Sequence, residues 1–156
     1  RRGPRHGMPS RVSGAVVDTL LAQVGAVLES LTVRSGAPAT LSQRARALAA
    51  EAGRLRIVLE GPGELGVAQQ ETTLPLSTLV GRLYSTTEAW TGPPTADQAR
   101  LTVLAHSQLS RLLADLRPLL EQGLPGLRQA MDQAGIPWPA GEAPELPDNL
   151  LPPYRP

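Results

Sequence analysis

The residues best able to do chemistry in this 156-residue chain surround His106. Ser107 and Ser110 are possible nucleophiles, and Asp115 could orient the imidazole as in a Ser-His-Asp hydrolase. A helical pattern runs through all four residues, so Ser107 points about 100° away from His106, and Asp115 lies more than two turns along the axis. The spacing therefore favours a structural histidine, and we predict no catalytic residue.

The sequence does not support two other signatures of ligand binding. Residues 61–66 match G-x-G-x-x-G, but that fingerprint follows a strand and opens a helix, whereas here a helical pattern precedes it and Pro62 occupies the turn. The Glu-x-x-His spacing that holds metals inside helical bundles does not occur in the sequence. The chain also has no cysteine to form a disulfide or a thiolate site. We therefore expect no cofactor, metal or nucleotide site.

Composition and charge limit the class of protein. Leu, Ala and Val dominate the apolar residues and Phe is absent, which favours helix packing and predicts an all-α fold. All fifteen basic residues are Arg, a bias typical of a high-GC bacterium, and the formal net charge is only +1, so we predict no nucleic-acid partner. No uninterrupted apolar run reaches the roughly 20 residues that span a bilayer, so we expect no transmembrane segment.

The chain divides into an arm, a bundle and a tail. Residues 1–11 predict a cationic flexible arm, in which Arg1, Arg2 and Arg5 could contact an anionic membrane surface weakly. Residues 12–135 predict a helical bundle, and residues 136–156 a Pro-rich extended tail. The arm has neither an initiator Met nor the apolar core of a signal peptide, so we expect a chain that was processed or cut from something longer.

Four segments repeat apolar residues at spacings of three and four, which predicts four amphipathic helices. We expect helices over 12–35, 41–59, 76–90 and 96–120. Residues 124–134 either continue the last of these helices or form a short fifth helix. Short loops join the first and second pairs, so the simplest arrangement is an antiparallel up-down-up-down four-helix bundle. The predicted inward-facing residues are Val17, Leu21, Val24, Leu28, Leu48, Leu55, Leu59, Leu83, Leu109, Leu112 and Leu116.

Three local sequence signals predict where these helices begin, end or kink. Gly61 should end the second helix. Thr95 lies three residues before Gln98, the spacing of a capping box. Pro118 lacks a backbone donor, so it should kink the fourth helix or mark a break near residues 122–123.

The tail carries the residues that we predict to bind a partner. Trp138 lies between two prolines, where it could fold back on the bundle or dock in a groove of another protein. Pro139, Tyr154 and Arg155 complete this hypothetical partner-binding set.

The second half of the chain has a recognisable order of motifs. Its segments are Leu83-Tyr84, Pro93-Pro94-Thr95, Leu109 through Leu120, Leu124-Pro125-Gly126-Leu127 and Gly135-Ile136-Pro137. This order resembles the C-terminal helical region of bacterial BNR-repeat proteins, which are sortilin- or sialidase-like propellers. The resemblance implies a bundle that follows β-rich domains in an exported protein, periplasmic or extracellular. It also implies that any ligand-binding activity lies upstream, and no functional residue of the propeller has a counterpart here.

These observations predict a non-catalytic helical structural or docking module. It would pack against a protein partner or upstream domains of the same polypeptide, within a larger exported protein or a multi-subunit assembly. The alternative is a small enzyme or ligand carrier with a site in the bundle around His106, to which Tyr84 and Arg82 could contribute.

Overall fold

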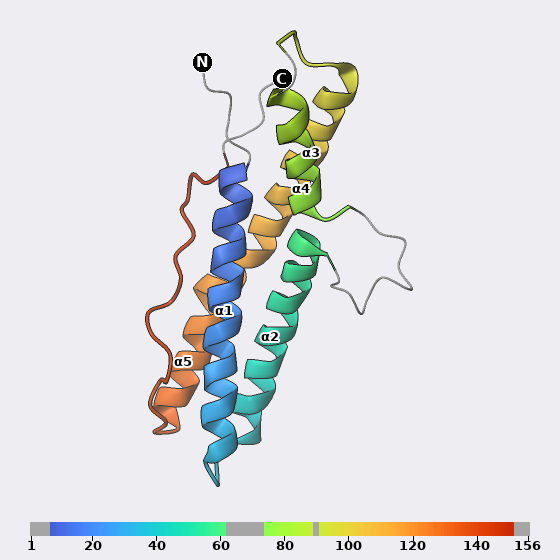
Figure 1. Cartoon of the computed structure of the whole chain (residues 1–156). Coiled ribbons are helices and arrows are strands. Elements are labelled where there is room, and N and C mark those ends of the chain that lie inside the picture. The colour runs from blue at the N-terminus through green and yellow to red at the C-terminus, as the bar shows by residue number, and fades with distance from the viewer. Residues whose placement is uncertain (1–6, 62–73, 89–90, 152–156) are drawn as a thin grey trace.

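The computed structural model describes residues 7–61, 74–88 and 91–151 (Figure 1). These residues form helices and no strand, which confirms the predicted all-α class. The elements are α1 (Gly7–Val33), α2 (Ala39–Glu60), α3 (Leu76–Glu88), α4 (Ala96–Pro118), the π-helical turn η1 (Leu119–Gly123) and α5 (Leu124–Gln133).

The helices line up in columns (Figure 1): α1 forms one column, α2 and α3 form the second, and α4, η1 and α5 form the third. Figure 1 shows α3 running in the same direction as α2, so the expected up-down-up-down order is not the arrangement in the structure. The start of α3 adjoins the end of α2, where a Cβ on Gly61 would lie 3.0 Å from Pro75 Cγ. The lengths of the helices leave a place for α3 on α1. Helix α1 has 27 residues and α2 has 22, which correspond to about 40 and 33 Å, so α3 covers the part of α1 that extends beyond α2.

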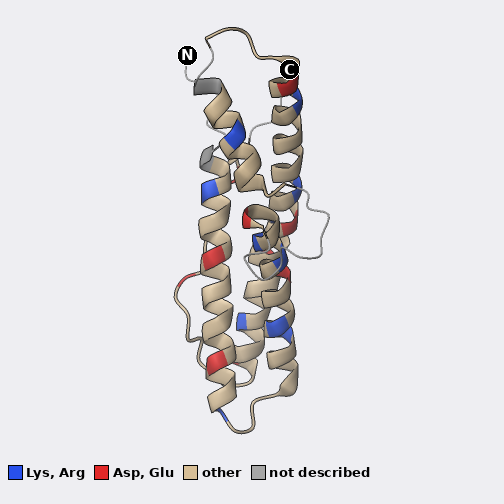
Figure 2. Ribbon diagram, turned by 45° about the vertical axis from the view of Figure 1, so that its right-hand side comes forward, with Lys and Arg blue, Asp and Glu red and all other residues tan. Residues whose placement is uncertain are grey.

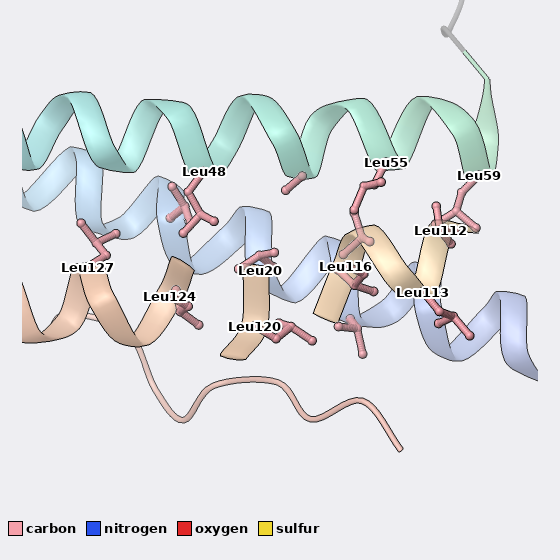
Figure 3. Packing of buried hydrophobic residues seen from close by; sticks show 14 of the residues in the cluster. Leu20, Leu48, Leu55, Leu59, Leu112, Leu113, Leu116, Leu120, Leu124 and Leu127 are labelled. Atoms are coloured by element: carbon pink, nitrogen blue, oxygen red, sulfur yellow. The ribbon is translucent and has the colours of Figure 1, made fainter. Parts of the chain in front are cut away.

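The core confirms most of the predicted inward-facing residues. Six residues that repeat at spacings of four and three along α2 are all buried, and we call them the α2 stripe: Leu41, Ala45, Leu48, Ala52, Leu55 and Leu59. Figure 3 shows Leu48, Leu55 and Leu59 pointing toward leucines of α4, η1 and α5. The predicted residues of α3 and α4 are buried as well, since Leu83, Leu109, Leu112 and Leu116 are at most 5% exposed.

The buried face of α1 differs from the predicted one. Val17 and Val24 are fully buried, but Leu20 and Val27 occupy the core positions expected for Leu21 and Leu28, which are only partly buried. Both sets repeat at spacings of three and four, so the period alone cannot separate them. The choice is made by the neighbours, because α1 packs against α2, α3 and α4 at once.

Helix α1 also begins earlier than expected, at Gly7, so residues 7–11 belong to the helix and not to the arm. Pro9 lies in the first turn, where a helix has no use for the backbone N–H that proline lacks. The buried Ser13 hydroxyl donates to the Pro9 carbonyl at 2.7 Å. Arg1, Arg2 and Arg5 lie outside the described residues.

The length and composition of α1 would suffice to cross a membrane, contrary to the expectation from uninterrupted apolar runs. Within residues 9–33 an 18-residue window has a mean hydropathy of 1.5, and 39% of that window is buried inside the bundle. A core helix of a bundle meets the same criterion, and α1 supplies buried residues such as Leu20 to this core.

The predicted capping box at the start of α4 is confirmed. Thr95 Oγ1 accepts from the Gln98 backbone N–H at 3.2 Å, and Gln98 Oε1 accepts from the Thr95 N–H at 2.8 Å. We expect Thr95→Ala to lower the free energy of unfolding by about 1 kcal/mol, because one helical N–H loses its acceptor. Urea unfolding followed by circular dichroism would measure this loss. Thr95→Ser retains the hydroxyl, so an equal loss in that variant would contradict the capping explanation.

Pro118 ends α4 and is followed by the π-helical turn η1. This turn ends at Gly123, where the sequence predicted an interruption of the helix. Proline has no N–H for the helical ladder, and the wider turn shifts the pairing, so that the Leu124 N–H donates to the Leu119 carbonyl five residues back. Gly123 closes the turn against α2, where a Cβ would lie 2.8 Å from Leu48 Cδ1. The missing side chain therefore permits the third column to approach α2 closely.

Candidate functional site

The residues that could cooperate with His106 lie in different surroundings. His106 is half-buried on α4, whereas Ser107 and Ser110 are exposed. Asp115 turns toward α2 instead, with its Oδ2 3.8 Å from Arg54 Nη2. Tyr84 on α3 is 62% exposed and Arg82 is exposed as well. Within the described ranges no three His, Asp or Glu side chains gather as a metal site would require.

Basic and acidic residues alternate along the helices in the view of Figure 2. The arginines of α2 reach both neighbouring columns: Arg56 Nε lies 3.7 Å from Asp18 Oδ1 on α1, and Arg54 pairs with Asp115 on α4. These groups are about half exposed, so each pair contributes at most about 1 kcal/mol. The pairs help to set the alignment of the columns, and they offer no concentrated field for an anionic ligand.

A tight turn after α5 sends the chain back along the bundle. Gly135 has a φ of +70°, the Ile136 N–H donates to the Met131 carbonyl at 2.9 Å, and the Gly135 N–H donates to the Asp132 carbonyl at 3.0 Å. This pattern is a Schellman motif, in which a residue in the left-handed conformation ends the helix. Met131 and Ile136 are both buried, as the apolar contact of that motif requires.

We expect Gly135→Ala to lower the free energy of unfolding by about 1–2 kcal/mol. A Cβ would meet no atom within 4 Å there, so the loss comes from the backbone conformation alone. Gly25→Ala is the matched control, since its Cβ also meets open space but its backbone is helical, and we expect a small gain in stability. Equal changes in the two variants, measured by urea unfolding, would contradict this assignment.

Beyond this turn, residues 136–151 form a segment without helix or strand, which we call the strap. Figure 1 shows the strap passing α5 and following α1 toward the end where α1 begins. Ile136 is buried, and other apolar residues of the strap pack partly buried against the core: Trp138, Leu146, Leu150 and Leu151. The strap is therefore a packed layer of the molecule.

Polar groups from two columns hold the strap. Gln23 of α1 donates through Nε2 to the Glu142 carbonyl. Arg117 of α4 donates through Nη2 to the Pro147 carbonyl at 3.0 Å and through Nη1 to Asp148 Oδ1 at 3.3 Å. These contacts fix the strap at two points along its length.

The aromatic anchor of the strap packs on its own chain. The Arg128 guanidinium on α5 lies 5.9 Å from the centre of the Trp138 ring, and the indole N–H donates to the Gly141 carbonyl at 3.3 Å. Of the predicted partner-binding residues, Trp138 is thus folded back, Pro139 is exposed, and Tyr154 and Arg155 lie outside the described residues.

Sequence reasoning missed Gln23, Arg117 and Arg128 as contacts of the strap. Gln23 offered a signal, because it is a polar residue beside Val24 on a helix that is otherwise apolar at this level. The two arginines offered none, since they resemble ordinary solvated residues of an amphipathic helix.

An open groove of about 600 Å³ separates part of the strap from α4, η1 and α5. Arg117, Leu120 and Arg128 line the helical side, and Glu142, Glu145 and Leu146 line the strap side. Its walls carry both signs of charge and no arrangement of nucleophile, base and orienting group.

Comparison with family models, curated proteins and solved structures found no match for this chain. The resemblance to the helical region of BNR-repeat proteins therefore has no support beyond its motifs.

Proposed function

We propose that this chain is a non-catalytic helical module that packs against a protein partner or another domain of the same polypeptide. The observation that carries the proposal is the α3–α4 hairpin, which projects beyond the N-terminal end of α1 (Figure 1). Large apolar side chains are exposed on this hairpin: Tyr84 is 62%, Val103 47% and Leu104 45% exposed.

The hairpin has a packed core of its own, with Leu76 and Leu79 of α3 fully buried, but the Val103 and Leu104 side chains of α4 are about half exposed. Where α1, α2 and the third column meet, leucines such as Leu55 and Leu116 are at most 1% exposed. Covering a Val or Leu side chain stabilises a complex by up to about 1.5–3 kcal/mol, so an apolar partner surface on Val103 and Leu104 would gain substantially. Such a surface is a docking site for a protein and has no groups for catalysis.

The test is purification of the tagged full chain from its native source, with the paired variant Val103→Ser, Leu104→Ser beside the wild type. We expect a stoichiometric partner that the variant loses, while urea unfolding shows little change in stability because both residues are half exposed. Val33→Ser is the matched control, since Val33 is 83% exposed at the far end of α1. A wild-type chain that is monomeric and binds nothing would contradict the proposal.

The proposal extends to a larger exported protein or assembly, in which β-rich domains precede this module. This extension rests on the motif resemblance alone. The intact mass of the native gene product would test it, since a mass well above that of 156 residues would place the module at the end of a longer chain.

The variant His106→Ala distinguishes the docking module from the competing hypothesis of an enzyme or carrier site around His106. We expect His106→Ala to leave the stoichiometric complex intact, because the proposed partner contacts the exposed Val103 and Leu104 side chains and His106 itself is half-buried. Loss of a turnover or of a bound small molecule in His106→Ala, with retained fold, would support that hypothesis instead.

A further inference from the structure

We infer that the surface beneath the strap is a binding site for an extended, acidic, proline-rich peptide, and that the strap occupies this site in cis. We call this surface the seat. It consists of Gln23 on α1, Arg117 on α4, Leu120 on η1 and Arg128 on α5, with the apolar core residues that the strap covers. It lies on a different part of the molecule from the exposed residues of the α3–α4 hairpin.

The direction of the hydrogen bonds carries the inference. Apart from the Ile136 N–H in the turn that ends α5, each hydrogen bond described above between the helices and the strap has its donor on the helix and a carbonyl or carboxylate acceptor on the strap. Proline residues have a carbonyl but no N–H, so a proline-rich segment offers more acceptors than donors. Long donor side chains such as Gln23 and Arg117 therefore match this kind of backbone, as aromatic and donor groups do in other sites for proline-rich ligands.

Charge adds to the match. Residues 136–151 contain Glu142, Glu145 and Asp148 and no basic residue. The groove beside them is lined on the helical side by two arginines, Arg117 and Arg128, against the single acidic Glu121. Arg117 is 29% exposed, which strengthens its bond to the Pro147 carbonyl relative to that of a fully solvated arginine, whereas the Asp148 carboxylate is 94% exposed and its pairing with Arg117 contributes little to stability.

The strap does not satisfy the seat completely. Gln23 is 8% exposed, and its Oε1 is buried without a hydrogen-bond donor in the described part of the chain. Buried acceptors of this kind are rare in native structures and weaken the state that contains them. The strap supplies a carbonyl at Glu142 but no donor beside it, and Pro144 two residues later has no N–H. The unpaired Oε1 atom therefore lowers the stability of the strap-bound state, which favours exchange of the strap for a segment that supplies a donor.

The test uses the full-length chain with substitutions in the strap alone: Trp138→Ser, Leu146→Ser and Asp148→Asn. These changes weaken the cis occupant and leave Gln23, Arg117 and Arg128 in place. A fluorescent peptide with the wild-type sequence of residues 136–151 should bind this variant about tenfold or more tightly than it binds the wild-type chain, in which the tethered strap competes. Fluorescence anisotropy would measure both affinities.

Two matched changes define the specificity of this binding. In the strap variant, Arg117→Gln or Gln23→Leu should weaken the peptide by about fivefold or more, whereas Arg111→Gln, an exposed arginine on the same helix, should not. A peptide of the same composition in scrambled order should bind at least tenfold more weakly. Equal binding of the scrambled peptide, or no binding of the wild-type peptide to either chain, would overturn the inference.

Hydrogen exchange of the wild-type chain gives a readout that does not depend on the strap variant remaining folded. The strap amides 141–151 should exchange through local opening, orders of magnitude faster than the core of α2 and α4. Exchange of these amides only with global unfolding would show that the strap is an inseparable part of the core, and would overturn the inference.

Discussion

Leu20→Ala should lower the free energy of unfolding by about 3–4 kcal/mol, whereas Leu21→Ala, one residue away, should lower it by about 1 kcal/mol or less. Leu20 is fully buried, and its truncation leaves a cavity among α1, α2 and α4 that close-packed neighbours fill only partly. Leu21 is only partly buried at the edge of the core, so solvent and mobile neighbours can occupy the vacated space. Comparison of the two variants therefore distinguishes the buried face of α1 in the structure from the face that the sequence period predicted.

Urea unfolding of both variants, monitored by circular dichroism, would measure these losses, with an unchanged m-value as evidence of the same two-state transition. Val27→Ala against Leu28→Ala repeats the comparison two turns along the helix. Equal losses for Leu20 and Leu21 would mean that α1 is rotated relative to the arrangement described here.

Leu48→Ala should lower the free energy of unfolding by about 2–3 kcal/mol, and Gly123→Ala by about 1–2 kcal/mol. The two losses share a cause, because the new Cβ at position 123 would lie 2.8 Å from Leu48 Cδ1 in a space where Leu48 is 6% exposed. Leu48 must leave its rotamer or α2 must move away from η1. In the double variant the new methyl group fills part of the vacated space, so the combined loss should be about 1 kcal/mol smaller than the sum.

Gly126→Ala provides the matched control for this contact. A Cβ at position 126 meets no atom within 4 Å, and the residue lies inside α5, so alanine should raise stability by about 0.5–1 kcal/mol through its helix propensity. Additive losses in the Leu48–Gly123 double variant, or losses of equal size at positions 123 and 126, would contradict the close approach of the third column to α2.

Local signals predicted much of this fold. The α2 stripe repeats Leu and Ala at spacings of four and three, so the period placed Leu48, Leu55 and Leu59 on the buried face. The Thr95–Gln98 spacing located the start of α4, and Gly61 and Pro118 located two helix ends, because each signal acts through its own backbone.

Features that depend on distant parts of the chain were not predictable in the same way. Helix α1 is apolar around most of its circumference, so two stripes fitted equally well and the neighbours decided between them. The direction of α3 depends on how the chain crosses from α2 to the second hairpin, which the short loops within each pair do not reveal. The seat of the strap joins Gln23 to Glu142 across 119 positions of sequence, and no local pattern connects them.

The returning strap also determines how the molecule would respond to mechanical load. Because the strap runs back along α1, the described ends of the chain, near Gly7 and Leu151, lie toward the same end of the bundle (Figure 1). Tension between these ends would peel the strap away from Leu151 toward Trp138, breaking the Arg117 contacts first and the Gln23 contact next. Each step opposes the force with one to three hydrogen bonds, so the strap would yield at low force while the helices, which are not pulled along their common axis, keep their core intact.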